Sequence, residues 1–155
     1  MICSIDFYPT LLEMAGLKPQ RDQIIDGVSL CPLLLKGKSL KKREVYCHFP
    51  HYMPATDNYP STSVRSGDWK LIRVYGEGKE RVPAYELYHL KDDIGESKNL
   101  AAANPKLVAK LDRLIEDHVN QTQGIFPKLN PVFKPGAESP MGKKPVFPIE
   151  KYPSY

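Results

Sequence analysis

Residues 65–72 read Arg-Ser-Gly-Asp-Trp-Lys-Leu-Ile, and this stretch predicts a β-hairpin at the centre of the fold. Gly67 and Asp68 form a good tight-turn pair. The residues on either side, 62–65 and 69–75, have the pattern of two strands. A tight turn between two strands requires that they run antiparallel, so this stretch predicts an antiparallel sheet.

Two further strands extend this sheet. Residues 45–49 alternate their side chains with a period of two, as expected of a half-buried strand. Prolines interrupt residues 51–61, which are predicted to form a loop. Residues 84–90 form the next predicted strand, with Tyr85 and Leu87 on one face. The sequence therefore predicts a short antiparallel sheet of about four strands.

One long helix follows the predicted strands. Asn104 is placed to cap it, Pro105 occupies the first helical position, and Gly124 is predicted to end it. An apolar stripe at helical spacing comprises Leu107, Leu111, Leu114 and Ile115, with His118 or Val119 at its end. This stripe should lie on the sheet. The predicted fold class is therefore α+β, with an antiparallel sheet packed by a C-terminal helix.

The chain before the first strand has a different pattern. Residues 6–16 read Asp-Phe-Tyr-Pro-Thr-Leu-Leu-Glu-Met-Ala-Gly and predict a helix that Asp6 caps and Gly16 terminates. Its apolar residues lie on more than one side, so more than one neighbouring segment must pack against this helix. We therefore expect an exposed apolar patch where a further domain should pack. A second short helix is predicted at residues 30–36, with Ser29 as its cap and Gly37 as its stop.

Composition narrows the class of protein. The chain has 155 residues, of which 41% are hydrophobic and 26% charged, and its formal net charge is +4. This composition is typical of a globular domain. Basic residues form no continuous face with interleaved aromatic rings, so we expect no nucleic-acid partner. There is no run of eighteen apolar residues, which predicts no membrane span. Prolines punctuate residues 125–155, which predicts an extended tail.

The three cysteines show neither a metal-binding spacing nor a disulfide framework. We expect Cys3, Cys31 and Cys47 to be buried or half-buried thiols that behave as small hydrophobic side chains. Cys47 lies in the alternating stretch and should therefore occupy one face of a strand.

Three motifs in the same order resemble the C-terminal part of the sulfatase family, in the alkaline-phosphatase superfamily. They are the N-terminal string from Asp6 to Gly37, the hairpin string quoted above, and residues 85–100, which read Tyr-Glu-Leu-Tyr-His-Leu-Lys-Asp-Asp-Ile-Gly-Glu-Ser-Lys-Asn-Leu. The resemblance implies three parts: residues 1–38 as a remnant of the large sulfatase domain, residues 39–124 as the C-terminal subdomain, and residues 125–155 as a proline-rich tail.

The nucleophile pattern of that family, Cys/Ser-x-Pro-x-Arg, does not occur in this sequence. We therefore assign no catalytic residue and no metal ligand, and expect no cofactor in this chain. The resemblance implies a calcium-type divalent ion and a formylglycine in the complete enzyme. It also implies two partners: an N-terminal catalytic domain or an equivalent chain, and a sulfated small molecule or glycan. The chain alone should not hydrolyse sulfate esters.

Candidate substrate-binding residues are His48, His51, Tyr52 and Arg65. The first three lie where a predicted strand opens into a proline-rich loop, and loops on rigid strands often bind ligands. An imidazole can donate hydrogen bonds to an anionic ester or a sugar hydroxyl, and the resemblance implies that His48 or His51 faces the substrate. Alternatively, one of these histidines packs in the structure and the other is solvated. Arg65 could bind a sulfate through its guanidinium fork or define the sheet.

Two alternative functions remain open from the sequence. One is a free-standing binding or interaction module derived from the same subdomain. The other is part of a related phosphodiesterase or phosphonate hydrolase. The first residues lack the basic and apolar regions of a signal peptide, while the resemblance implies that the parent enzyme is periplasmic or secreted.

Overall fold

The computed structural model describes residues 1–51, 59–75 and 84–128. The chain divides into two compact units, Met1–Glu44 and Val45–Tyr155. Tyr52 and most of the proline-rich tail lie outside the described residues.

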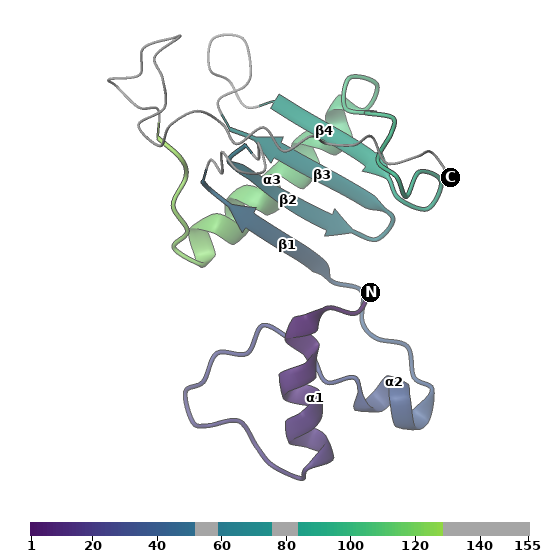
Figure 1. Cartoon of the computed structure of the whole chain (residues 1–155), viewed down its shortest axis with the longest axis vertical. Coiled ribbons are helices and arrows are strands. Elements are labelled where there is room, and N and C mark those ends of the chain that lie inside the picture. Colours follow the sequence, from purple (N-terminus) through teal and green to yellow (C-terminus); the bar gives the residue numbers. More distant parts are fainter. Residues whose placement is uncertain (52–58, 76–83, 129–155) are drawn as a thin grey trace, which may run out of the picture. The chain divides into compact units, whose positions relative to one another are not determined.

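The second unit contains a four-stranded sheet in the order β1-β2-β3-β4 (Figure 1). Its strands are β1 (Glu44–Phe49), β2 (Ser61–Ser66), β3 (Trp69–Val74) and β4 (Ala84–His89). Strands β2 and β3 pair antiparallel from Ser66 opposite Trp69, so the connecting turn has two residues. Gly67 has φ 61°, a value that favours glycine and that a type II′ turn requires at its first central position. The predicted hairpin and antiparallel sheet are confirmed.

Helix α3 (Pro105–Gln121) covers one face of this sheet (Figure 1). Three sheet residues (Val64, Leu71 and Leu87) and three helix residues (Leu111, Ile115 and Val119) form the core, and none of them is more than 2% exposed. The cross-strand register places Leu71 opposite both Val64 and Leu87. The predicted packing of the last helix on the sheet is therefore confirmed, and the stripe ends at Val119.

The two ends of α3 differ in detail from the prediction. Pro105 is the first residue of the helix and Asn104 precedes it as the N-cap, but the Asn104 side-chain amide donates to the carbonyl of Leu100 at 2.9 Å. At the other end, Gln123 has the positive φ, 54°, that Gly124 was expected to supply. Gly124 is needed for a different reason, because a Cβ there would lie only 3.0 Å from Cγ1 of Val119.

The outer edge of β4 is paired by a short segment that follows it. Asn99 Oδ1 accepts from the backbone N–H of Leu87 at 3.1 Å, and Asn99 Nδ2 donates to the carbonyl of Tyr85 at 3.2 Å. The N–H of Leu100 then donates to the carbonyl of Leu87 at 2.8 Å. The Asn-Leu pair at the end of the third motif thus satisfies backbone groups that an edge strand would leave unpaired.

The first unit contains a short 3-10 helix η1 (Ser4–Asp6) followed by α1 (Phe7–Met14) and α2 (Cys31–Lys36). Gly16 and Gly37 follow these α-helices with φ 68° and 61°, so both predicted stops are confirmed. Within the described residues, no helix combines the length and the apolar composition needed to cross a membrane.

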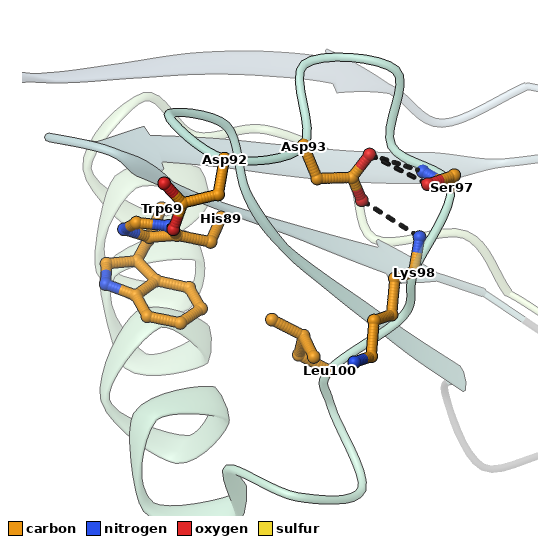
Figure 2. A pocket seen from close by; sticks show the side chains of 7 residues that line it. All are labelled: Trp69, His89, Asp92, Asp93, Ser97, Lys98 and Leu100. Carbon is orange, nitrogen blue, oxygen red and sulfur yellow. Dashed lines mark hydrogen bonds and ion pairs between the residues drawn. The ribbon is translucent and has the colours of Figure 1, made fainter.

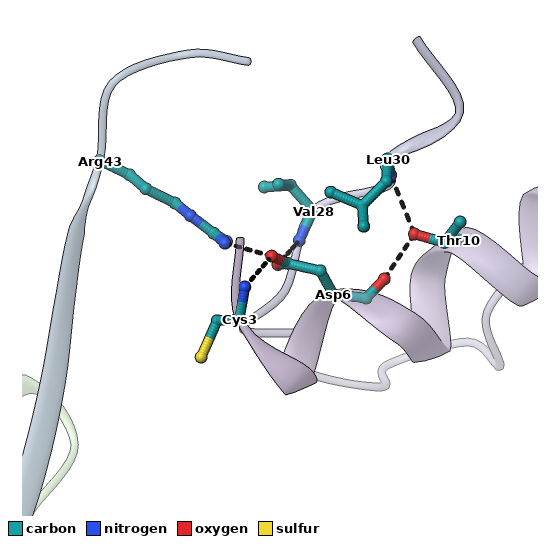
Figure 3. Close-up of polar contacts among 6 residues, drawn as sticks. All are labelled: Cys3, Asp6, Thr10, Val28, Leu30 and Arg43. Carbon is teal, nitrogen blue, oxygen red and sulfur yellow. Dashed lines mark hydrogen bonds and ion pairs between the residues drawn. The ribbon is translucent and has the colours of Figure 1, made fainter. Parts of the chain in front are cut away.

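Asp6 does not cap α1 with its side chain, contrary to the prediction. Its fully buried carboxylate instead accepts from the backbone N–H groups of Cys3 at 2.8 Å and Val28 at 3.0 Å, and forms an ion pair with Arg43 (Figure 3). The residues before Phe7 already form η1, so the first turn of α1 needs no side-chain acceptor. The Arg43 hydrogen bond lowers the pKa of Asp6 to about 2.

Thr10 makes a second connection between α1 and the segment before α2 (Figure 3). Its hydroxyl donates to the carbonyl of Asp6 at 2.5 Å and accepts from the N–H of Leu30 at 2.9 Å. Gly27 approaches the backbone just before Asp6, because an added Cβ there would be 2.0 Å from the carbonyl oxygen of Ile5. The first sequence motif is therefore explained by close backbone packing around two buried polar side chains.

Large apolar side chains are exposed in the first unit. Phe7 is 60% exposed, Leu11 64% and Met14 52%. These three positions follow a helical spacing and share a face of α1. The predicted apolar patch is confirmed as a feature of residues 1–44.

Cys47 corrects one prediction. Cys31 is buried and Cys3 half-buried as expected, but Cys47 is exposed. The Tyr46 ring stacks on His118 of α3 with centroids 3.9 Å apart, so even-numbered positions of β1 face the helix. Cys47 points to the opposite face, which α3 does not cover.

Candidate functional site

His48 lies on the helix-covered face of β1. Its Nδ1 is 2.7 Å from Thr62 Oγ1, which is 2.7 Å from the Tyr75 hydroxyl. Thr62 is fully buried, and burial raises the pKa of Tyr75. The His48 Nε2 atom is buried without a hydrogen-bond partner among the described residues. These contacts indicate a packing role for His48, and its predicted substrate-facing role stays a prediction.

His51 follows the end of β1 and is exposed. Its ring meets the Phe49 ring edge-on, with centroids 5.3 Å apart and planes at 80°. An exposed imidazole on a rigid strand end can reach a ligand without losing any buried contact. Tyr52, the next candidate, lies outside the described residues.

Arg65 lies on the face of β2 opposite Thr62 and Val64, and is half-buried. Its Nε donates to the Gly67 carbonyl at 3.3 Å. Its cross-strand neighbour Lys70 pairs with the Glu96 carboxylate at 2.7 Å. No ion pair of Arg65 occurs within the described part of the chain, so its guanidinium has donors that an anion could accept.

The structure therefore separates the candidate residues by face. His48 faces α3, whereas Arg65 faces the uncovered side, where it lines a hollow of about 250 Å³ with Cys47 and Ser63. His51 lies at the end of β1. Within this unit, His48 and Arg65 therefore lie on opposite faces of the sheet.

A polar cluster between sheet and helix was not predicted from the sequence. Asp112 of α3 accepts from Tyr85 Oη at 2.8 Å and from Arg73 Nη1 at 3.2 Å. Burial and the Asp112 bond raise the pKa of Tyr85 to about 12. The Arg73 guanidinium also lies 5.4 Å from the Tyr75 ring centroid and 5.5 Å from that of Phe126. These groups attach α3 to β3 and β4.

The family model of the N-sulphoglucosamine sulphohydrolase C-terminal region matches residues 1–123. This match spans both compact units and includes all three motifs. The chain belongs to this family. The predicted relation to the C-terminal part of sulfatases is thereby confirmed.

Curated relatives of this sulfatase C-terminal chain are themselves sulfatases. A sulfatase of Formosa agariphila is 36% identical over 108 residues, which cover 66% of this chain and 19% of the relative. Arylsulfatase K of Danio rerio is 31% identical, covering 75% of this chain and 21% of the relative. A delta 4,5-hexuronate-2-O-sulfatase of Bacteroides thetaiotaomicron is 30% identical, covering 81% of this chain and 25% of the relative. The chain thus spans about a fifth to a quarter of these relatives.

Solved structures agree with this family. One, in complex with its substrate D-glucosamine-2-N,6-O-disulfate, has a TM-score of 0.59 and 29% identity, and covers 76% of this chain and 24% of that protein. Another, in complex with a neocarrahexaose, has a TM-score of 0.57 and 24% identity, and covers 79% of this chain and 26% of that protein. The second supports the fold alone.

Sulfatase chemistry in a complete enzyme implies calcium and a formylglycine. Within the described ranges, no group of three or more His, Cys, Asp or Glu side chains could bind a metal ion. Calcium requires six to eight oxygen ligands. The described residues therefore do not fit this ion.

Proposed function

We propose that this chain is the C-terminal part of a sulfuric ester hydrolase and acts with a catalytic domain that it does not itself contain. The match of the sulfatase C-terminal family over residues 1–123 is the observation on which this proposal rests. The catalytic domain supplies the nucleophile and the divalent ion, and this chain supplies a packing surface and substrate-cleft residues. The chain by itself has no sulfatase activity.

The packing surface is the exposed apolar side of the first unit. Its side chains include Phe7, Leu11 and Met14, which are more than half exposed. Burying an apolar side chain of this size contributes about 1.5–3 kcal/mol, so a patch of several such side chains favours association strongly. The large domain of a sulfatase is the partner that this patch fits.

Two described residues are the proposed cleft contacts. His51 is exposed at the end of β1, and Arg65 has guanidinium donors that are not used in an ion pair within the described ranges. His48 and Tyr52 remain proposed members, the first with a competing packing role and the second beyond the described residues. An imidazole and a guanidinium both suit an anionic sulfate.

The proposed substrate class is a sulfated saccharide. A relative that is 30% identical acts on a sulfated hexuronate, and a structure that is 29% identical contains a disulfated glucosamine. This chain spans 24% of the latter protein, and the proposal leaves the remaining cleft residues to the catalytic domain.

Activity assays test the proposal. The purified chain should release no sulfate from 4-nitrophenyl sulfate or from disulfated glucosamine. Joining it to a sulfatase domain that contains a Cys/Ser-x-Pro-x-Arg nucleophile and calcium should give sulfate release above that of either part alone. Sulfate release by the isolated chain, or no gain when the two parts are joined, contradicts the proposal.

Sequencing the coding DNA next to this reading frame gives an independent test. An in-frame Cys/Ser-x-Pro-x-Arg motif upstream supports a single polypeptide enzyme. If no such motif is present in frame or in a neighbouring gene, the chain is better explained as a free-standing binding module.

A further inference from the structure

A hollow of about 590 Å³ lies at the end of the sheet where β3 begins and β4 ends (Figure 2). Its lining comprises Trp69, His89, Asp92, Asp93, Ser97, Lys98 and Leu100. Trp69 and His89 are direct cross-strand partners, so the hollow starts at the end of the sheet opposite His51. Its volume lies within the range of about 300–1,000 Å³ that is typical of small-molecule sites.

One wall of this hollow is a rigid aromatic platform. The Trp69 ring packs partly against the hydrophobic core and is half-buried. It also contacts the His89 ring, with centroids 4.6 Å apart and planes at 54°. Leu100 adds apolar surface beside it (Figure 2). Because Trp69 is fixed on two sides, its remaining face can receive a flat apolar surface with little loss of side-chain entropy.

The opposite wall is polar and has two different kinds of carboxylate. Asp93 accepts from Ser97 N at 3.0 Å, Ser97 Oγ at 2.9 Å and Lys98 N at 2.9 Å, so it is used to fix the loop. Among the described residues, Asp92 is bonded only through its Oδ2, to His89 Nδ1 at 2.6 Å, and its side chain is 77% exposed. One oxygen of Asp92 is therefore available to accept hydrogen bonds beside the indole.

Lys98 completes the rim with an exposed ammonium group. The hollow thus offers a flat apolar ring, a carboxylate acceptor and an ammonium donor. A ligand with one apolar face and a rim of hydroxyl groups matches all three. A purely apolar ligand would instead desolvate Asp92 without replacing its hydrogen bonds, which is unfavourable.

We propose that this hollow is an accessory saccharide site. One sugar ring stacks its C–H face on Trp69, its hydroxyl groups donate to Asp92, and Lys98 binds a hydroxyl oxygen or an anionic substituent. The site belongs to this chain alone and does not depend on the proposed catalytic partner. It would bind a glycan non-covalently at the end of the sheet that is remote from His51.

Trp69 is the single tryptophan of the chain, so its fluorescence reports directly on this site. We would titrate the full 155-residue chain with lactose and with disulfated glucosamine and follow indole emission. A saturable change with at least one of the two is expected. N-acetyltryptophanamide, titrated in parallel, gives the response of a free indole.

Two variants change polar lining residues of the hollow and leave Trp69 in place. Asp92→Asn keeps the shape of the side chain and should weaken lactose binding about tenfold, the loss expected for a charge-assisted hydrogen bond. Lys98→Met should weaken binding of the sulfated sugar by a similar factor. Asp117→Asn and Lys110→Met change exposed positions of α3 and should leave both affinities unchanged.

The proposal is contradicted if neither sugar gives a saturable change in emission. It is also contradicted if both variants bind the sugars with the affinity of the wild type. Far-ultraviolet circular dichroism of each variant verifies folding. Neither result bears on sulfate release, so the accessory site and the proposed sulfatase function are tested separately.

Discussion

The carboxylate of Asp6 and the guanidinium of Arg43 form an ion pair although 37 positions separate the two residues in the sequence. The Asp6 side chain is fully buried and that of Arg43 is 18% exposed. A buried carboxylate is tolerated only when its charge is paired and its lone pairs are satisfied. This pair therefore links the last residues of the first unit to the end of η1, directly before α1.

Asp6→Ala should strongly destabilise the first unit. The change leaves the Arg43 charge without its partner and removes the acceptor of two backbone N–H groups. Breaking a buried pair of this kind costs about 3–5 kcal/mol. Urea unfolding measures the loss, and Asp26→Ala, at an exposed position of the same unit, is the control. Equal midpoints for the two variants would show that the pair adds no stability.

Stability should fall in acid through Asp6. Its pKa is lowered from 3.8 to about 2 in the folded chain, chiefly by the Arg43 hydrogen bond. The folded state thus binds the proton more weakly than the unfolded state, so this contribution is complete above about pH 4 and is lost as pH falls towards 2. As pH falls between these values, the thermal unfolding midpoint should decrease more steeply in the wild type than in Asp6→Asn. Parallel curves would contradict the assignment.

Gly27→Ala should unfold or strongly destabilise the first unit. A Cβ at this position would lie 2.0 Å from the backbone oxygen of Ile5, so the backbone must move. An unstrained Gly→Ala change usually stabilises a protein by about 0.4–1 kcal/mol, so a net loss of stability at this position would report the steric clash. Gly95→Ala is a matched control because an added Cβ there meets no atom within 4 Å. Similar unfolding midpoints for the two variants would refute the close approach.

Asp112→Ala should loosen α3 from the sheet. It removes the acceptor of Tyr85 and Arg73 while both remain partly buried, which costs about 1–3 kcal/mol. Asp117→Ala on the exposed side of the same helix should cost little. Hydrogen exchange of α3 amides measures the difference. Unchanged protection in Asp112→Ala would assign the attachment of α3 to the hydrophobic core alone.

His48 and His51 should respond differently to alanine. In a complete enzyme, His51→Ala should raise KM or lower kcat with unchanged stability, because this side chain is exposed. His48→Ala removes one of the two hydrogen-bond partners of the buried Thr62 hydroxyl and should lower stability by about 1–3 kcal/mol. Kinetics and unfolding measured on both variants separate the roles. Unchanged kinetics with lowered stability in His51→Ala would make that residue a packing residue.

Local patterns in the sequence were sufficient for much of the fold. The two-residue turn at Gly67, the start of α3 at Pro105 and the stops at Gly16 and Gly37 were all predicted correctly. Each depends on the φ preference of one residue or on a side-chain period, which are properties of a short segment. The three motifs likewise indicated the sulfatase family, which the family match confirmed.

The tertiary structure alone decided the rest. A period of two in β1 showed that its side chains alternate but not which set α3 would cover, so Cys47 was wrongly expected to be buried or half-buried. The charged partners of Asp6 and Asp112 are Arg43 and Arg73, which lie far away in the sequence, and no local preference specifies them. Contacts of this kind form only when distant segments pack together, because the free energy of burying a polar group depends on what the folded chain places beside it.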